Sequence, residues 1–289
     1  MFAELSADDA LVVARLLSAL QCAGAGAGAT CQARIGARLE LLVYDASLVW
    51  MHHIAVSHLS TPELAASAEA VAGASAEAPA EAAAGATAGA GAVSAAAVAV
   101  DMPLGKLARA LRLAANIGIV RLTLEPGVCQ VAARGRHNTV VHALGAAPGR
   151  DYYALLASAA AAVRGARTVA VRAAHLAQAL ASSAEGSEDE VELALGTRQV
   201  EFHHGEWRAG IPCYVLHAGA DARVCVAARL LCALARVAKA QAAPHVAIAY
   251  RADSPLCLAT DNGVCAYTAY VAPVVDDRAP REAPCPGTL

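Results

Sequence analysis

The sequence predicts an α+β protein built from four similar units, each a short helix followed by a meander of antiparallel strands. Four segments share one pattern, a Leu, then Ala or Leu, any residue, Ala and Leu: 16–20, 107–111, 176–180 and 230–234. Leucines four residues apart lie on one helical face, so each segment predicts a short amphipathic helix. A stretch of alternating apolar and polar residues, typical of half-buried strands, follows each helix: 29–45, 118–133, 189–204 and 245–272.

Each alternating stretch is interrupted by residues that favour tight turns. The interruptions are Gly36-Ala37, Glu125-Pro126-Gly127, Gly196-Thr197 and Asp261-Asn262-Gly263. Strands separated by such turns pair as antiparallel hairpins. With two units in each domain and two domains in the chain, the sequence predicts an internal repeat.

Low-complexity segments suggest how the chain is divided. Residues 64–96 contain few large side chains, and we predict a mobile insertion because such a segment buries little apolar area to offset chain entropy. The predicted organisation is an N-terminal domain at 1–144, a connector at 145–166, a C-terminal domain at 167–277 and a flexible tail at 278–289.

The composition excludes several classes of protein. Hydrophobic residues make up 57% of the 289-residue chain, but 78 of them are alanine, and no window holds the roughly 20 large apolar residues of a membrane span. The acidic start of the sequence predicts no signal peptide. The net charge of -3 excludes a strongly basic protein, although it allows a basic patch on an acidic body.

No arrangement of reactive residues indicates an enzyme. The nine cysteines are scattered without a C-x-x-C pair, so we expect buried thiols in a reducing compartment. The pairs His52-His53 and His203-His204 point to opposite faces of a strand, which suits a metal poorly and predicts surface or edge histidines. Without a nucleophile motif, we expect no catalytic residue, metal or cofactor.

Basic residues cluster on the predicted helices. Lys106, Arg109 and Arg112 recur every third residue, away from Leu107 and Leu111. The fourth helix carries Arg229, Arg236 and Lys239, the first carries Arg15, and Arg172 directly precedes the third, which has neither Lys nor Arg. These positions predict basic helix faces, and ordinary solvated surfaces are the alternative interpretation.

Three segments resemble one protein family. Residues 269–277 (AYVAPVVDD) resemble the C-terminal segment of sliding clamps of the proliferating cell nuclear antigen type. Residues 104–124 resemble the second helix of that family with its turn and next strand, and residues 43–49 (VYDASLV) resemble a conserved loop. The order of the three along the chain supports the resemblance.

The resemblance implies a ring of three subunits with helices lining the hole and sheets outside. Edge strands at about 135–141 and 204–214 would pair between subunits. The helices would face the phosphates of double-stranded DNA without reading its sequence. The residues that would face DNA are Arg15, Lys106, Arg109, Arg112, Arg172, Arg229, Arg236 and Lys239.

The same resemblance implies a nuclear DNA polymerase processivity factor, opened by a clamp loader and bound by peptides with a glutamine, an aliphatic residue and two aromatics. The implied pocket residues are Tyr44, Leu48, Tyr153, Leu155, Leu156, Pro255, Tyr270, Ala272 and Pro273. Half-buried core tyrosines and a short connector helix are the alternatives for Tyr44, Tyr270 and the two leucines. Two other functions also fit: a subunit of a heterotrimeric checkpoint clamp, and a monomeric viral polymerase accessory protein or transcription factor.

Overall fold

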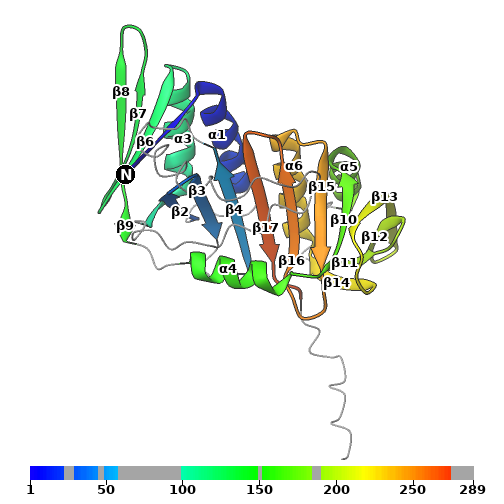
Figure 1. The fold of residues 1–289 in the computed structure, drawn as a ribbon. Helices are drawn as coiled ribbons and strands as arrows, with labels where there is room; N and C mark the ends of the chain where they lie inside the picture. Colours follow the sequence, from blue (N-terminus) through cyan, green and yellow to red (C-terminus); the bar gives the residue numbers. More distant parts are fainter. Residues whose placement is uncertain (23–28, 45–48, 58–98, 149–151, 184–189, 275–289) are drawn as a thin grey trace, which may run out of the picture.

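The structure is a computed structural model that describes residues 1–22, 29–44, 49–57, 99–148, 152–183 and 190–274 (Figure 1). The predicted insertion at 64–96, the tail at 278–289 and Leu48 lie outside these ranges. Within them the predicted α+β class is confirmed, and each of the four Leu-Ala segments lies in a helix.

The first half of the chain contains two of the predicted units. In order, its elements are β1 (Phe2–Leu5), α1 (Ala7–Cys22), β2 (Thr30–Ile35), β3 (Leu39–Tyr44), β4 (Trp50–Val56), β5 (Val100–Pro103), α3 (Leu104–Ala115), β6 (Ile119–Glu125), β7 (Val128–Arg134), β8 (Thr139–Gly145) and β9 (Ala147–Pro148).

The second half repeats that order after a connecting helix. Its elements are α4 (Tyr153–Ala162), β10 (Arg167–Arg172), α5 (Ala173–Ser183), β11 (Glu190–Leu195), β12 (Gln199–His204), β13 (Trp207–His217), β14 (Ala222–Ala227), α6 (Ala228–Gln241), β15 (His245–Tyr250), β16 (Leu256–Asp261) and β17 (Cys265–Val271). Among the described residues, each half thus reads strand, helix, four strands, helix and three strands, and the first half ends with the additional two-residue strand β9.

Strand pairing repeats as well. The order β1-β6-β7-β8 in the first half corresponds to β10-β15-β16-β17 in the second, and β5-β2-β3-β4 corresponds to β14-β11-β12-β13. The predicted turns separate the strands as expected. Gly127 and Gly263 adopt φ of 84° and 83°, a conformation that glycine reaches without strain.

The main core lies between one layer of helices and the sheets. In Figure 1, α1, α3, α5 and α6 lie behind the strands. The inward residues of the strands are buried. The paired leucines of the repeat pattern are buried as well, namely Leu16, Leu20, Leu107, Leu111, Leu176, Leu180, Leu230 and Leu234. Burying one leucine side chain contributes roughly 1.5–3 kcal/mol, so the pattern that predicted the helices also fixes which face packs.

Two central strands join the halves into one sheet. β4 pairs antiparallel with β17, with His52 opposite Ala269. The prediction of surface or edge histidines at 52 and 53 is wrong, because β17 covers the edge of β4: His52 is 4% exposed and His53 is half-buried. The prediction of small, buried thiols holds for Cys31, Cys129, Cys257 and Cys265.

The free sheet edges differ slightly from those expected. β8 begins at Thr139, because residues 135–138 form the β7–β8 turn closed by the hydrogen bond from Gly135 N to Asn138 O, 2.9 Å long. The second expected edge corresponds to β13, which extends to His217 and pairs there with β10. The expected edge segments are thus corrected to 139–145 and 207–212.

Candidate nucleic-acid interface

Three of the described helices, α1, α3 and α6, expose predicted basic side chains on the side away from the sheets. On α3, Lys106, Arg109 and Arg112 are exposed, whereas Leu107 and Leu111 are fully buried. The helix follows directly from β5, so its apolar face is held on the sheet and its basic face points outward. Arg112 Nη2 donates to Ser18 Oγ on α1 at 2.9 Å, which fixes one guanidinium between two neighbouring helices.

The other predicted positions are distributed over the same layer. The exposed residues are Arg15 of α1, Arg172 at the end of β10, and Arg236 and Lys239 of α6. The side chain of Arg229 is outside the described part of the structure. α5 presents His175 and Gln178 to solvent in place of basic residues. A groove of about 780 Å³ between α5 and α6 is lined by Gln178, Arg236, Lys239, Leu180, Cys232 and several alanines.

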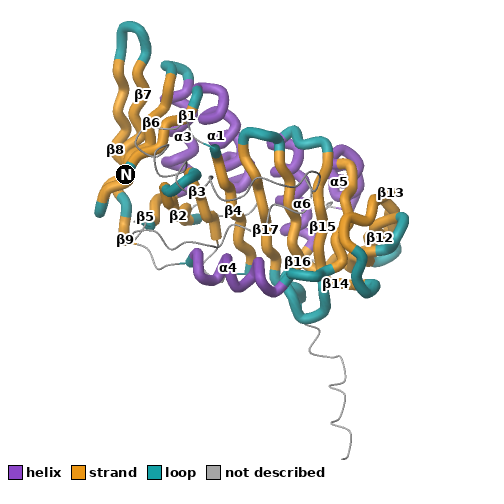
Figure 2. Tube along the Cα trace, viewed as in Figure 1, coloured by secondary structure: helices purple, strands orange, loops and turns teal. Residues whose placement is uncertain are grey.

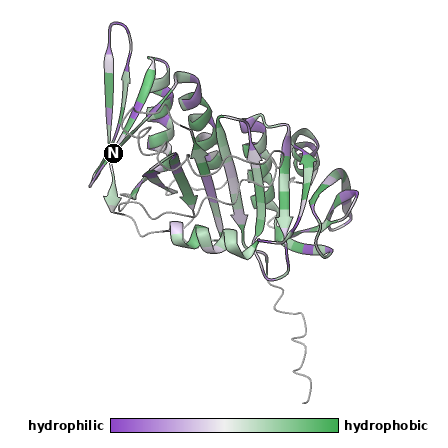
Figure 3. Ribbon diagram, viewed as in Figure 1, coloured by the Kyte–Doolittle hydropathy of each residue, from purple (hydrophilic) through white to green (hydrophobic). Residues whose placement is uncertain are grey.

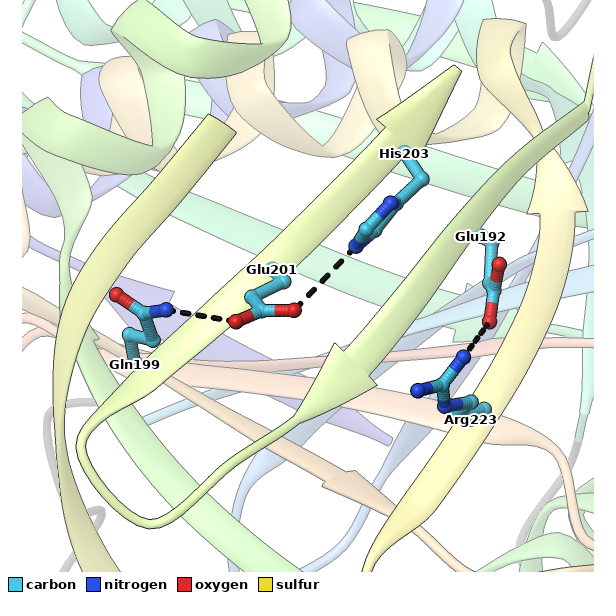
Figure 4. Close-up of polar contacts among 5 residues, drawn as sticks. All are labelled: Glu192, Gln199, Glu201, His203 and Arg223. Carbon is cyan, nitrogen blue, oxygen red and sulfur yellow. Dashed lines mark hydrogen bonds and ion pairs between the residues drawn. The ribbon is translucent and has the colours of Figure 1, made fainter. Parts of the chain in front are cut away.

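The opposite face of the second half is polar and carries acidic groups. There, Gln199 Nε2 donates to Glu201 Oε1 at 2.6 Å, and His203 Nε2 lies 3.4 Å from Glu201 Oε2 (Figure 4). These two contacts, that with Gln199 first, lower the pKa of the Glu201 carboxyl. Arg223 pairs with Glu192 at 3.1 Å on the neighbouring strands. These pairs lie at a solvated surface, and exposed ion pairs of this kind contribute little to stability.

The predicted partner-pocket residues fall into two groups. Tyr44, Tyr153 and Tyr270 are buried, at 7%, 6% and 5% exposure, under or within the connecting helix α4. The others are half-buried, namely Leu156, Pro255 and Pro273, or exposed, namely Leu155 and Ala272. The three tyrosines are thus core residues and the connector contains a helix, and the partner pocket stays a prediction.

A charged cluster beside Tyr153 was missed by the sequence analysis. Arg34 Nε donates to Glu40 Oε2 at 2.7 Å, and the Arg34 guanidinium carbon lies 4.0 Å from the centre of the Tyr153 ring. Burial lowers the pKa of nearby His53, partly offset by Glu40. The signal was present, because a hairpin turning at Gly36 puts residues 34 and 40 opposite each other.

Two structural features concern membrane insertion and metal binding. Among the described residues, no helix is long and apolar enough to cross a membrane. In the same residues, no group of three or more His, Cys, Asp or Glu side chains is placed to hold a metal ion.

Comparison with known proteins supports the fold through a solved structure. No family model matches the sequence, and no curated protein matches it. A crystal structure of the proliferating cellular nuclear antigen from Entamoeba histolytica is similar, with a TM-score of 0.59, 11% identity, and coverage of 95% of this chain and 98% of that chain. At this identity the match establishes the fold. The chain therefore has the fold of a DNA sliding clamp of the proliferating cell nuclear antigen type.

Proposed function

We propose that this chain is a sliding clamp: three copies close into a ring around duplex DNA and tether DNA polymerase and other replication and repair proteins, with the nucleus as its site of action. One observation carries the proposal. The two halves of the chain repeat the same fold, and β17 of the second half pairs with β4 of the first. The equivalent strands are β8 and β13: among the described residues β8 pairs only with β7, and residues 207–212 of β13 pair only with β12.

Matching strand registers between the halves gives the pairing between copies residue by residue. Ala269 in β17 corresponds to His142 in β8, and His52 in β4 corresponds to Trp207 in β13. Since Ala269 lies opposite His52, His142 of one copy is expected opposite Trp207 of the next. One step along, Val141 meets Arg208.

The backbone amides of both edges point the right way for this register. The bond from Gly135 N to Asn138 O turns the amides of residues 139, 141 and 143 away from β7. The bond from Cys213 N to Arg198 O likewise turns the amides of Arg208 and Gly210 away from β12, whereas Pro212 has no N–H to donate. Val141 and Arg208 therefore present free donors and acceptors to each other, as antiparallel pairing requires.

Helix packing supports the same contact. Val237 of α6 is fully buried where α6 packs against α1, but Leu113, its equivalent on α3, is 44% exposed. The helix equivalent to α1 is α5, so α3 of one copy would pack against α5 of the next. A hollow of about 320 Å³ between α5 and β13, lined by residues that include Gln178, Trp207 and Ile211, is where the neighbour would approach.

The basic helix layer suits a ring that slides. A single exposed contact with a phosphate contributes little, roughly 0–1 kcal/mol, so no contact holds the ring in one place. Retention then depends on topology, because a closed ring leaves a duplex only at a free end. Because the chain as a whole carries a net charge of -3, the attraction to DNA phosphates must come from the basic side chains of the helix layer.

The proposal is tested by mass and by retention on DNA. Analytical ultracentrifugation should give three times the chain mass of 29.2 kDa. The ring, once loaded, should stay on circular DNA and be lost from linear DNA unless the ends are blocked. A monomer that binds linear duplex equally well with free and with blocked ends would contradict the proposal. Co-purification with two different chains would favour a heterotrimer.

Removing two basic side chains from α3 should weaken DNA binding and its dependence on salt. Each phosphate contact contributes about 0.9 to the slope of log K against log salt, so Arg109→Ala with Arg112→Ala should flatten it by roughly 1–2 per copy. Fluorescence anisotropy over a salt series measures this. Arg223→Ala with Arg251→Ala, on exposed residues outside the four helices, is the matched control. An unchanged slope in the α3 variant would remove these residues from the DNA path.

A further inference from the structure

The connecting helix α4 covers the outer side of the sheet where the two halves meet. It crosses in front of the strands, opposite the other four helices (Figures 1 and 2). Two small apolar clusters lie beneath it. One contains Leu42, Tyr44 and Tyr153, and the other contains Val163, Ala166, Cys257 and Tyr270. Leu156 and Met51 pack against both, so α4 closes one continuous apolar surface.

The contacts that hold α4 in place come mainly from its first turns. The Tyr152 and Tyr44 rings have centroids 4.4 Å apart, and the Tyr153 hydroxyl donates to Glu40 O at 3.1 Å. The Tyr153 ring also receives the Arg34 guanidinium at 4.0 Å. The anchoring segment therefore consists of two adjacent aromatic residues, with an aliphatic residue, Leu156, three positions after the second.

The rest of α4 adds smaller contacts, in which Ala159 and Ala160 pack against the cluster that contains Tyr270. Residues 157–162 are alanines and one serine, and no residue of the helix is charged or strongly hydrophilic (Figure 3). Leu155 projects outward and is 44% exposed. At its end the chain turns through Gly165, whose φ of 71° suits glycine, and enters β10. A short helix whose larger anchors are Tyr152, Tyr153 and Leu156 is suited to leave and return as a unit.

We infer that α4 is a resident occupant of the partner-docking surface, and that a partner segment with two adjacent aromatic side chains and a nearby aliphatic one docks by displacing it. The inference rests on the tethering role proposed above. The partner's aromatics would take the positions of Tyr152 and Tyr153 against Tyr44, and its aliphatic residue would take that of Leu156 near Tyr270. Because α4 is tethered beside its site, it competes at high effective concentration.

Loosening α4 should strengthen peptide binding. The variant is Tyr153→Ala with Leu156→Ala, which removes two anchors and leaves the underlying strands unchanged. Two fluorescent probes are used: a synthetic copy of residues 150–164, and a peptide carrying glutamine, an aliphatic residue and two adjacent aromatics. We expect at least tenfold tighter binding of both to the variant than to the unmodified protein, since an occupied site lowers apparent affinity by the open fraction. Equal or weaker binding, or none to either protein, overturns the inference.

Hydrogen exchange on the unmodified protein provides a second measurement that needs no variant. With the aromatic peptide at saturating concentration, amides of 154–162 should lose protection if α4 is displaced. Gained protection, which means that the peptide binds on top of the helix, overturns the inference. Ser158→Ala is the matched control, because it alters the same helix on its exposed side and should leave the affinity unchanged.

The proposed function is tested separately on the same variants. Sedimentation and retention on circular DNA depend on the sheet edges and the basic helices, none of which α4 contributes to. If the Tyr153→Ala, Leu156→Ala variant still forms rings but binds the peptides no more tightly, the displacement of α4 is contradicted and the clamp function is not. Loss of rings from the unmodified protein contradicts the clamp function itself.

Discussion

Val141→Pro should convert the proposed trimeric ring into monomers without unfolding the chain. The amide of residue 141 points away from β7, so proline removes no hydrogen bond within the subunit, and proline is tolerated on an edge strand. Between copies it removes a donor facing Arg208 and places a ring where the next strand must approach. A lost hydrogen bond and a steric clash together cost roughly 3 kcal/mol or more at each seam, which corresponds to more than a hundredfold weaker association.

Sedimentation at micromolar concentration measures the result, and Val141→Thr, which keeps the amide and the branched side chain, is the control. Arg208→Pro should give the same monomers from the opposite edge. Mixing the two variants distinguishes the proposed contact from general damage. Each variant retains one intact edge, so the mixture should form a heterodimer that cannot close. Trimers of Val141→Pro, or a mixture that stays monomeric, would contradict the proposed pairing of β8 with β13.

The parts of the fold that depend on local pattern could be predicted from the sequence. Leu107 and Leu111 four residues apart fix the buried face of α3, and Glu125-Pro126-Gly127 fixes a turn because few residues suit those backbone angles. The exposed positions of Lys106, Arg109 and Arg112 follow from the same spacing. Their role toward DNA remains a prediction, since exposure alone does not identify a ligand.

Features that depend on pairing between residues far apart in the chain could not be predicted from the sequence. The His52-His53 pair lies inside the sheet only because β17, more than 200 residues later, covers the edge of β4. Similarly, Tyr44 and Tyr270 have the alternation of ordinary strand residues, and nothing in that pattern shows that the connector folds over them. The connector itself has no amphipathic period, because its alanines are alike on every side.

The buried histidine between β4 and β17 should make the protein lose stability as the pH falls below about 6.5. Nδ1 of His52 lies 2.6 Å from the Tyr267 hydroxyl inside the joined sheet, and burial lowers the pKa of His52 from 6.5 to about 3. Since the imidazole accepts a proton more readily in the unfolded chain, acid favours unfolding. The stability is present above the unfolded pKa and is lost progressively between about pH 6.5 and 3.

Between pH 7.5 and 5 the expected loss is about 2 kcal/mol in the free energy of unfolding, with a further contribution from His53, whose pKa burial also lowers. Urea unfolding at fixed ionic strength measures it. His52→Gln should flatten the slope because glutamine does not titrate, even if the variant starts from lower stability. Tyr267→Phe should retain the slope, since it leaves a neutral imidazole in the same buried position. A steep slope in His52→Gln would place the titrating group elsewhere and would mean that water reaches His52 where the halves meet.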